Sequence, residues 1–294
     1  MKAASFEYSR PETVEEACWQ LSRDDDARLI AGGQTLVPMM AMRLARPTRL
    51  IDIGRIPALS FIREEDGAQL VIGAMTRQAD AEREPSIAAA APLLARALPW
   101  VGHAATRSRG TIGGSIANAD PAAEIPLALA TLGGSVIART ERETLIIAVE
   151  DFFLGPMTTA LPPTAVLIEA RFPIWEHRRV GAAFLEISAR AGDFAYVSAA
   201  AQVALDDDGR CLACTVGIGG ATPVPRRLAA VAALVGSAIS ESRARDAAAA
   251  EIAGIEIMTD PHASTAYRRR VAITLAARAI LAARDEAMTN EARR

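Results

Sequence analysis

Short apolar runs alternate with helical patterns in the first part of the chain. The runs predict strands at residues 6–8, 28–31 and 50–53, and the intervening residues predict helices at 13–17 and about 35–42. Thr13, followed three residues later by Glu16, is typical of a capping box. We therefore expect a compact β-α-β unit with parallel strands that ends near residue 57.

A second and larger unit follows. Its strands are expected at residues 70–74, 135–138, 144–149 and 166–172, and its helices at 76–81, 92–100 and 121–132. Residues 173–179 are charged and irregular, which favours a domain boundary there.

Beyond this boundary the apolar positions alternate as in half-buried antiparallel strands. Strands are expected at residues 183–188, 197–205 and 212–218, with a hairpin at 206–209, and helices at 225–235, 242–252 and 264–284. The pattern predicts an α+β fold: a two-part first domain, residues 1–176 with subdomains 1–57 and 58–176, and a C-terminal antiparallel sheet with helices, residues 177–294.

Two glycine-containing stretches stand out against this pattern. Ala31-Gly32-Gly33-Gln34-Thr35 follows an apolar run, and Thr111-Ile112-Gly113-Gly114-Ser115 has similarly small side chains. Glycine lets the main chain approach a ligand closely, and successive N–H groups in such turns form anion-binding concavities. One such stretch is often just a strand-to-helix turn. Two of them suggest a pyrophosphate that is held from both sides.

Composition excludes several classes of protein. The chain has 294 residues, a formal net charge of −3 and 51% hydrophobic residues, so nothing indicates binding to nucleic acid. The start of the chain lacks the apolar segment of a signal peptide. The longest uncharged run, residues 152–168, contains three prolines and does not predict a membrane span. We expect a cytoplasmic protein.

Cysteine and histidine do not predict a metal site. Cys211 and Cys214 fall in a predicted strand, where residues three apart point to opposite faces, so we expect them to be buried packing residues. Three cysteines are too few for a four-thiolate iron–sulfur centre. The three histidines are far apart and lack ligand spacing.

The glycine stretches and their surroundings resemble the flavin-binding medium subunit of the molybdenum hydroxylases, the group that includes carbon monoxide dehydrogenase and xanthine dehydrogenase. Residues 29–36 resemble that family's first flavin loop. Residues 109–115 and 118–126 resemble its second loop, and residues 190–195 and 267–269 also match family patterns. The resemblance implies that this chain binds FAD, while a molybdenum cofactor lies in a large partner subunit and [2Fe-2S] clusters lie in a small one. It further implies a dimer of heterotrimers.

The same resemblance implies a set of cofactor-binding residues and no catalytic residue or metal ligand in this chain. The two stretches would hold the diphosphate and ribityl chain through backbone N–H groups. Glu124 would reach a ribityl or ribose hydroxyl, and Asp120 would either assist or only cap the next helix. The full set is Leu29, Ile30, Ala31, Gly32, Gly33, Gln34, Thr35, Leu36, Thr111, Ile112, Gly113, Gly114, Ser115, Asp120, Glu124, Val166, Leu167, Asp193 and Phe194.

Val166 and Leu167 would line the adenine or the ring edge through main-chain contacts. Asp193 and Phe194 would meet the isoalloxazine ring from the second domain, or else would only shape a loop and pack in the core. Gln34 and Asn118 stand where some relatives have histidine, and Phe194 where relatives have tyrosine or an aliphatic residue. A role that needs an imidazole is therefore absent at Gln34 and Asn118.

Two other function classes remain open. A self-contained oxidoreductase of the covalent-flavin oxidase fold would need its own substrate pocket and often a His or Cys that tethers the flavin. Neither glycine stretch contains one, although His103 lies upstream of the second. The second alternative is a cofactor-free assembly or regulatory protein with the same fold. Such a protein would not need the glycines of the two stretches, so their presence argues against this alternative.

Overall fold

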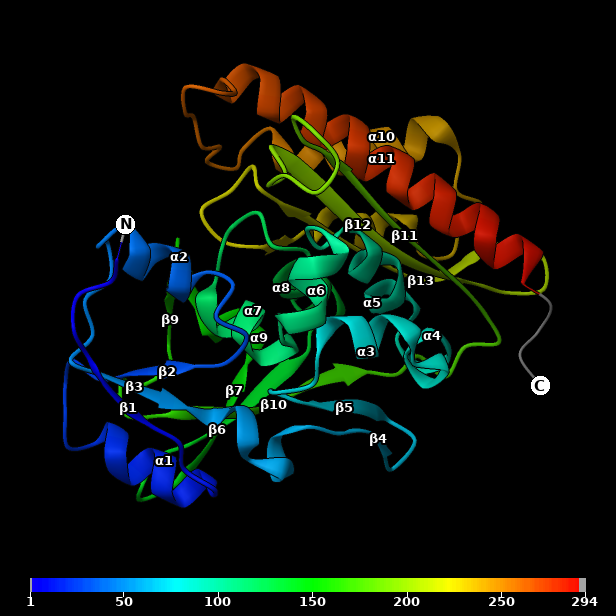
Figure 1. Ribbon diagram of the computed structural model, residues 1–294. Coiled ribbons are helices and arrows are strands. Elements are labelled where there is room, and N and C mark those ends of the chain that lie inside the picture. Colours follow the sequence, from blue (N-terminus) through cyan, green and yellow to red (C-terminus); the bar gives the residue numbers. More distant parts are fainter. Residues whose placement is uncertain (1, 291–294) are drawn as a thin grey trace.

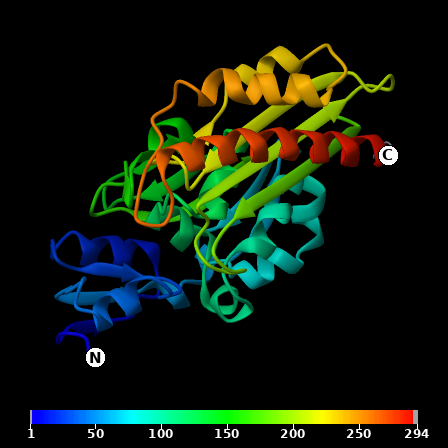
Figure 2. The same cartoon turned by 90° about the horizontal axis from the view of Figure 1, so that it is seen from above.

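The structure is a computed structural model that describes residues 2–290, and it confirms the α+β class. A small N-terminal unit, a central unit and a C-terminal unit follow one another along the chain (Figure 1). The N-terminal unit lies to one side of the other two (Figure 2).

The N-terminal unit is the expected β-α-β arrangement. Its parallel sheet has the order β1-β3-β2, and α1 and α2 follow β1 and β2. The elements are β1 (Glu7–Ser9), α1 (Val14–Leu21), β2 (Arg28–Ile30), α2 (Leu36–Ala41) and β3 (Arg49–Asp52). Thr13 Oγ1 accepts a hydrogen bond from the Glu16 amide, as predicted. The Glu16 carboxylate, however, bonds the amide of Glu12 instead of Thr13, so only half of the capping box is confirmed.

The central unit is built on an antiparallel sheet of order β4-β5-β10-β6-β7, against which its helices pack. The strands are β4 (Ile62–Glu65), β5 (Gln69–Gly73), β6 (Ser135–Arg139), β7 (Thr144–Ala148) and β10 (Val166–Pro173). The helices are α3 (Gln78–Arg83), α4 (Pro85–Ala90), α5 (Pro92–Ala97), α6 (Ala104–Arg109), α7 (Ile112–Asn118), α8 (Glu124–Leu132) and α9 (Val149–Phe152). A hairpin of β8 (Phe153–Gly155) and β9 (Thr158–Thr159) precedes β10.

The C-terminal unit is an antiparallel sheet of order β11-β12-β13-β14. Helices α10 and α11 cover one face of it (Figure 2), and α5 and α8 of the central unit pack against it from the other side. The elements are β11 (Arg179–Ile187), β12 (Val197–Leu205), β13 (Cys211–Gly219), β14 (Arg226–Arg227), α10 (Glu241–Ile252) and α11 (Thr265–Thr289). All nine residues of β12 are buried because both faces of the strand are covered.

Three expected helices differ from the structure. The helix expected at 225–235 is wrong: β14 pairs with β13, and only a 3-10 turn, Ala230–Leu234, follows. The helix expected at 92–100 is shorter in the structure: α5 ends at Ala97, and a 3-10 turn over Leu98–Trp100 follows it. Pro99 in this turn has no backbone N–H to continue the α-helical hydrogen bonds. The helix expected from residue 121 begins at Glu124, because residues 120–123 form a turn.

Candidate functional site

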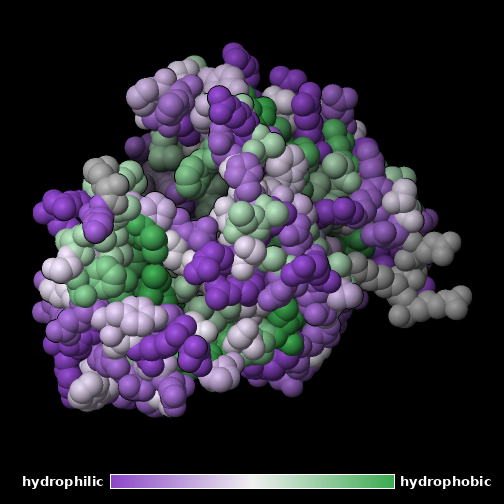
Figure 3. Space-filling model, in the orientation of Figure 1, coloured by the Kyte–Doolittle hydropathy of each residue, from purple (hydrophilic) through white to green (hydrophobic). Residues whose placement is uncertain are grey.

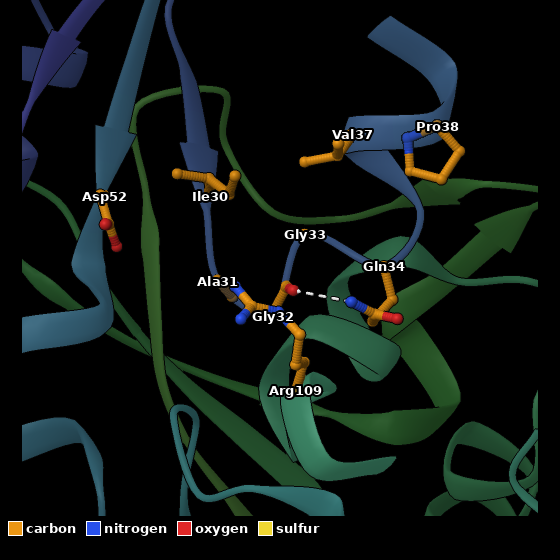
Figure 4. Close-up of a pocket in the computed structure, with 9 residues that line it drawn as sticks. All are labelled: Ile30, Ala31, Gly32, Gly33, Gln34, Val37, Pro38, Asp52 and Arg109. Atoms are coloured by element: carbon orange, nitrogen blue, oxygen red, sulfur yellow. Dashed lines mark hydrogen bonds between the residues drawn. The ribbon is translucent and has the colours of Figure 1, made fainter. Parts of the chain in front are cut away.

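A cleft of about 330 Å³ opens where β2 runs into the first glycine stretch (Figure 4). The ends of β2 and β3, the start of α2 and the last residue of α6 form its walls. The lining residues are Ile30, Ala31, Gly32, Gly33, Gln34, Val37, Pro38, Asp52 and Arg109. Ligands of parallel sheets bind beyond the carboxyl ends of the strands, which is where this cleft lies.

The first glycine stretch presents unused backbone donors. Gly33 has φ of +72°, a conformation that glycine adopts without strain. The Gln34 side chain bonds back to the Gly32 carbonyl at 3.3 Å (Figure 4), which stiffens the turn. Within residues 2–290 we find no acceptor for the N–H groups of Gly33, Gln34 and Thr35. This stretch therefore has the donors that a diphosphate requires.

The second glycine stretch is not a loop. It is the first turn of α7, in which Thr111 caps the helix by accepting a bond from the Gly114 amide at 3.0 Å. The amides of Ile112 and Gly113 donate to the carbonyls of Thr76 and Ala74. In this conformation the N–H groups of residues 112–115 are already used, so most of the free donors come from the first stretch.

The two stretches lie against each other. A Cβ on Gly32 would overlap the Arg109 carbonyl oxygen and lie 2.8 Å from Gly110 Cα. A Cβ on Gly114 would lie 3.6 Å from the Ala31 Cβ. Glycine is thus needed at position 32 so that the chain entering α7 can approach the turn after β2.

Two charged side chains of the cleft, Asp52 and Arg109, were not among the predicted site residues. Asp52 ends β3, accepts bonds from the Gly54 amide at 2.8 Å and the Tyr8 hydroxyl, and pairs with Arg10 at 3.5 Å. Its hydrogen bond to the Tyr8 hydroxyl raises the pKa of that tyrosine. The parallel pairing of β2 and β3 was the available signal for Asp52, because it brings the ends of both strands to one edge.

Apolar side chains form the outer rim of the cleft. Val37 is half exposed on α2, and Pro38 beside it also lines the cleft. Figure 3 shows apolar side chains gathered over this part of the molecule. The cleft thus combines a polar floor of main-chain donors with an apolar rim, as sites for small molecules commonly do.

Asp120 does not cap the next helix. Its carboxylate accepts a bond from the Ala122 amide at 2.9 Å and so closes the turn before α8, whose N-cap is Ala123. Glu124 is the first residue of α8 and is only 9% exposed. Burial, with a further contribution from the Asp120 charge, raises the pKa of Glu124 to about 7.

Glu186 on β11 lies near Glu124, on the sheet that packs against the central helices. Burial and the neighbouring Glu124 charge raise the pKa of Glu186 to about 8. Both Glu186 carboxylate oxygens are buried without a hydrogen-bond partner within the described residues. The two carboxyl groups therefore favour protonation near neutral pH.

The other predicted site residues lie elsewhere. Val166 and Leu167 are buried in β10 and pack in two different cores, so only their main chain is left for a ligand. Asp193 and Phe194 are exposed, and Phe194 is 75% exposed, which overturns the alternative that it packs in the core. The lining of the cleft contains none of these four residues.

The loop that carries Asp193 and Phe194 nevertheless reaches the central unit. Gly192 has φ of +86°, and a Cβ there would lie 2.6 Å from Nδ1 of His103, the residue before α6. Since α6 leads directly into Arg109 and the second glycine stretch, this loop of the C-terminal unit rests beside the approach to α7.

Within residues 2–290 no cluster of three metal-ligating side chains occurs, and every helix there is too short or too polar to traverse a bilayer. The expectation that Cys211 and Cys214 point to opposite faces is wrong. A bulge in β13 shifts the register between Ala204 and Leu205, so both cysteines face the side covered by α10 and α11.

Comparisons with known proteins find similar sequences over almost the whole length of this chain. Residues 4–175 match the FAD binding domain in molybdopterin dehydrogenase, and residues 182–283 match the CO dehydrogenase flavoprotein C-terminal domain. The chain is 36% identical to the 6-hydroxypseudooxynicotine dehydrogenase complex subunit alpha of Paenarthrobacter nicotinovorans, with 95% of each chain covered. It is 35% identical to the nicotine 6-hydroxylase medium subunit of the same organism, covering 96% of this chain and 99% of that one.

A solved structure has the same fold as this chain over nearly its full length. A chain of carbon monoxide dehydrogenase from Hydrogenophaga pseudoflava superposes with a TM-score of 0.92 at 34% identity, covering 97% of this chain and 99% of that one.

Proposed function

This chain belongs to the FAD-binding medium subunits of molybdenum hydroxylase-type complexes, and on that premise we propose that it is an electron-transfer subunit. It accepts electrons from iron–sulfur clusters of a small partner subunit and passes them to an external acceptor. Substrate is hydroxylated at a molybdenum cofactor in a large partner subunit. The FAD, when bound, supplies the redox chemistry, and this chain supplies binding and orientation.

The observation that carries the proposal is the cleft at the first glycine stretch. Its unused N–H groups between Gly33 and Thr35 and the nearby Arg109 suit a diphosphate. Small-ligand sites span about 300–1,000 Å³, so a cleft at the lower end holds part of a dinucleotide. The residues present therefore fit FAD, with its diphosphate at this turn.

In our proposal the rest of the FAD extends beyond this cleft to the remaining predicted site residues. Residues 29–36 supply the free backbone donors for the diphosphate, residues 111–115 contact the diphosphate and ribityl chain from the first turn of α7, and Glu124 accepts a hydroxyl hydrogen bond. Val166 and Leu167 contribute main-chain contacts, and Asp193 and Phe194 approach the ring from the C-terminal domain. We place the domain boundary between residues 176 and 177. We propose a dimer of heterotrimers that works in the cytoplasm.

Replacing Gly33 by valine tests the site. A branched side chain at φ of +72° would strain the turn and lie against Val37, so we expect the purified variant to lose most of its FAD. Gly67→Val is the matched control, because Gly67 has φ of +65° with nothing within 4 Å and lies far from the cleft, in the β4–β5 turn. The measurement is the ratio of flavin to protein absorbance, with circular dichroism to check folding. Equal flavin content in both variants would refute the assignment.

Acid precipitation separates this function from the covalent-oxidase alternative. The cleft lining contains no histidine or cysteine that could tether the flavin. We expect all flavin in the supernatant. A yellow pellet would favour the self-contained oxidase.

A further inference from the structure

The CxxC pair of the C-terminal domain is not used by the proposed function, yet the fold brings its two thiols together. In a regular strand, residues three apart lie on opposite faces. Here Leu205 of β12 pairs with Cys211 and Val203 pairs with Cys214, so one extra residue on β13 is bulged out. Val203 and Leu205 share the face covered by α10 and α11, and both cysteines therefore share it too.

The two thiols influence each other's ionisation. The neighbouring Cys214 thiol lowers the pKa of Cys211, and the neighbouring Cys211 together with burial raises the pKa of Cys214. The Cys211 side chain is buried, and Cys214 is partly exposed. A thiolate is the form of cysteine that reacts with oxidants, so this pair contains both an activated nucleophile and a second thiol beside it.

The backbone around the pair is fixed. The Cys211 amide donates to Ser237 O at 2.9 Å, and the Gly236 amide donates to Cys211 O at 2.8 Å. Cys211 is thus held between β12 on one side and the 236–237 turn on the other. Little conformational entropy remains to be lost when the two sulfurs join.

We propose that Cys211 and Cys214 form a redox-active dithiol that hydrogen peroxide converts to an intramolecular disulfide. The Cys211 thiolate attacks one peroxide oxygen and breaks the O–O bond, giving a sulfenic acid and, after proton uptake, water. Cys214 Sγ then attacks that sulfur, and the departing hydroxide takes the thiol proton as a second water. Two electrons pass from the thiols to the peroxide, and one S–S bond forms.

Peptide mapping of the folded full-length chain tests this proposal. Cleavage after Arg210 and Arg226 yields one peptide, residues 211–226, that contains both cysteines and no other. After peroxide treatment, catalase quenching and alkylation under denaturing conditions, we expect this peptide unalkylated and lighter by two hydrogen atoms. Dithiothreitol should restore two alkylated thiols. Recovery of two alkylated cysteines, or of separate sulfinic acids, would overturn the proposal.

Cys18 and single variants provide the controls. Cys18 is buried and its thiol donates to the Arg139 carbonyl at 3.2 Å, away from the pair, so it should be recovered alkylated from the same sample. In Cys214→Ser, Cys211 has no partner thiol and should accumulate as sulfinic acid instead of an intramolecular disulfide. The readout is the state of the thiols, so it is independent of whether the chain carries FAD.

Discussion

At the scale of single residues, the buried carboxyl groups of Glu124 and Glu186 are the most unusual feature. Each lacks the solvation that an ionised carboxylate needs, and each repels the other when both are charged. Their pKa values of about 7 and about 8 lie above the ordinary value of a glutamate. The folded chain therefore binds more protons than the unfolded chain in this range, and its stability decreases as pH rises.

Glu186→Gln should remove part of this pH dependence. The favourable contribution of neutral Glu186 is complete below pH 4.5 and is lost as the pH rises through about 8. We expect the variant to melt at nearly the parent temperature at low pH and above it in alkaline buffer. The gain there should be a few degrees, since about 1 kcal/mol shifts Tm by roughly 2–4 °C in domains of 150–250 residues. Glu176→Gln, at an exposed position, is the control and should show no such divergence.

At the scale of elements, Arg268 joins the start of α11 to the sheet beneath it. Its guanidinium donates to the carbonyls of Tyr196 and Gly220 and pairs with Asp260, and the side chain is 4% exposed. The Gly220 carbonyl directly follows β13, and the Tyr196 carbonyl directly precedes β12. Neither carbonyl lies within a strand, so the hydrogen-bond ladder of the sheet supplies no donor to it. One side chain thus satisfies main-chain groups beside two separate strands.

We predict that Arg268→Met destabilises the protein by about 2–4 kcal/mol, because each buried carbonyl left without a donor costs about 1–3 kcal/mol. Urea unfolding of the flavin-free chain measures it. Arg278→Met on the exposed side of the same helix should stay within about 0.5 kcal/mol of the parent. Similar losses in both variants would show that the Arg268 network contributes little.

The order of most elements could be predicted from the sequence, because periodicity and turn residues determine it locally. The failures have physical causes. The glycines at residues 113 and 114 favour an anion-binding turn over residues 111–115, but in the structure Thr111 caps the first turn of α7, and Ala74 and Thr76 accept two of its amides. The bulge at Leu212 depends on pairing with β12 and has no local signal. Asp52 belongs to the cleft only through the parallel pairing of β2 and β3.

At the scale of the whole molecule, the loop containing Gly192 is where the C-terminal unit contacts the approach to α7. Its contact with His103 fixes one point of the loop, while Phe194 two residues later remains 75% exposed. A large exposed aromatic side chain often marks a place that a ligand or partner covers.

Phe194→Ala should leave FAD content unchanged and alter the rate at which reduced flavin passes electrons to its acceptor, by several-fold. The reason is that, in the proposed placement of Phe194 beside the isoalloxazine, its ring limits access of the acceptor and excludes water. Stopped-flow reoxidation of the dithionite-reduced holoprotein measures the rate. Val235→Ala, at a half-exposed apolar position in the C-terminal domain, is the matched control. An unchanged rate for Phe194→Ala would place the loop away from the flavin.

Helix α11 also has a consequence for synthesis, because it is made long after the strands that it covers. It covers β11 and β12, and its end bonds back to β11: the Glu286 carboxylate accepts from the Ala182 amide, and the Asn290 side chain donates to Val180 O. Gly181 lies so close to α11 that a Cβ would overlap the Ala283 carbonyl. The ribosome releases these strands about a hundred residues before their covering helix. We therefore expect that a nascent chain lacking α11 exposes the apolar face of β11 and β12, and exposed apolar surface of this kind favours aggregation.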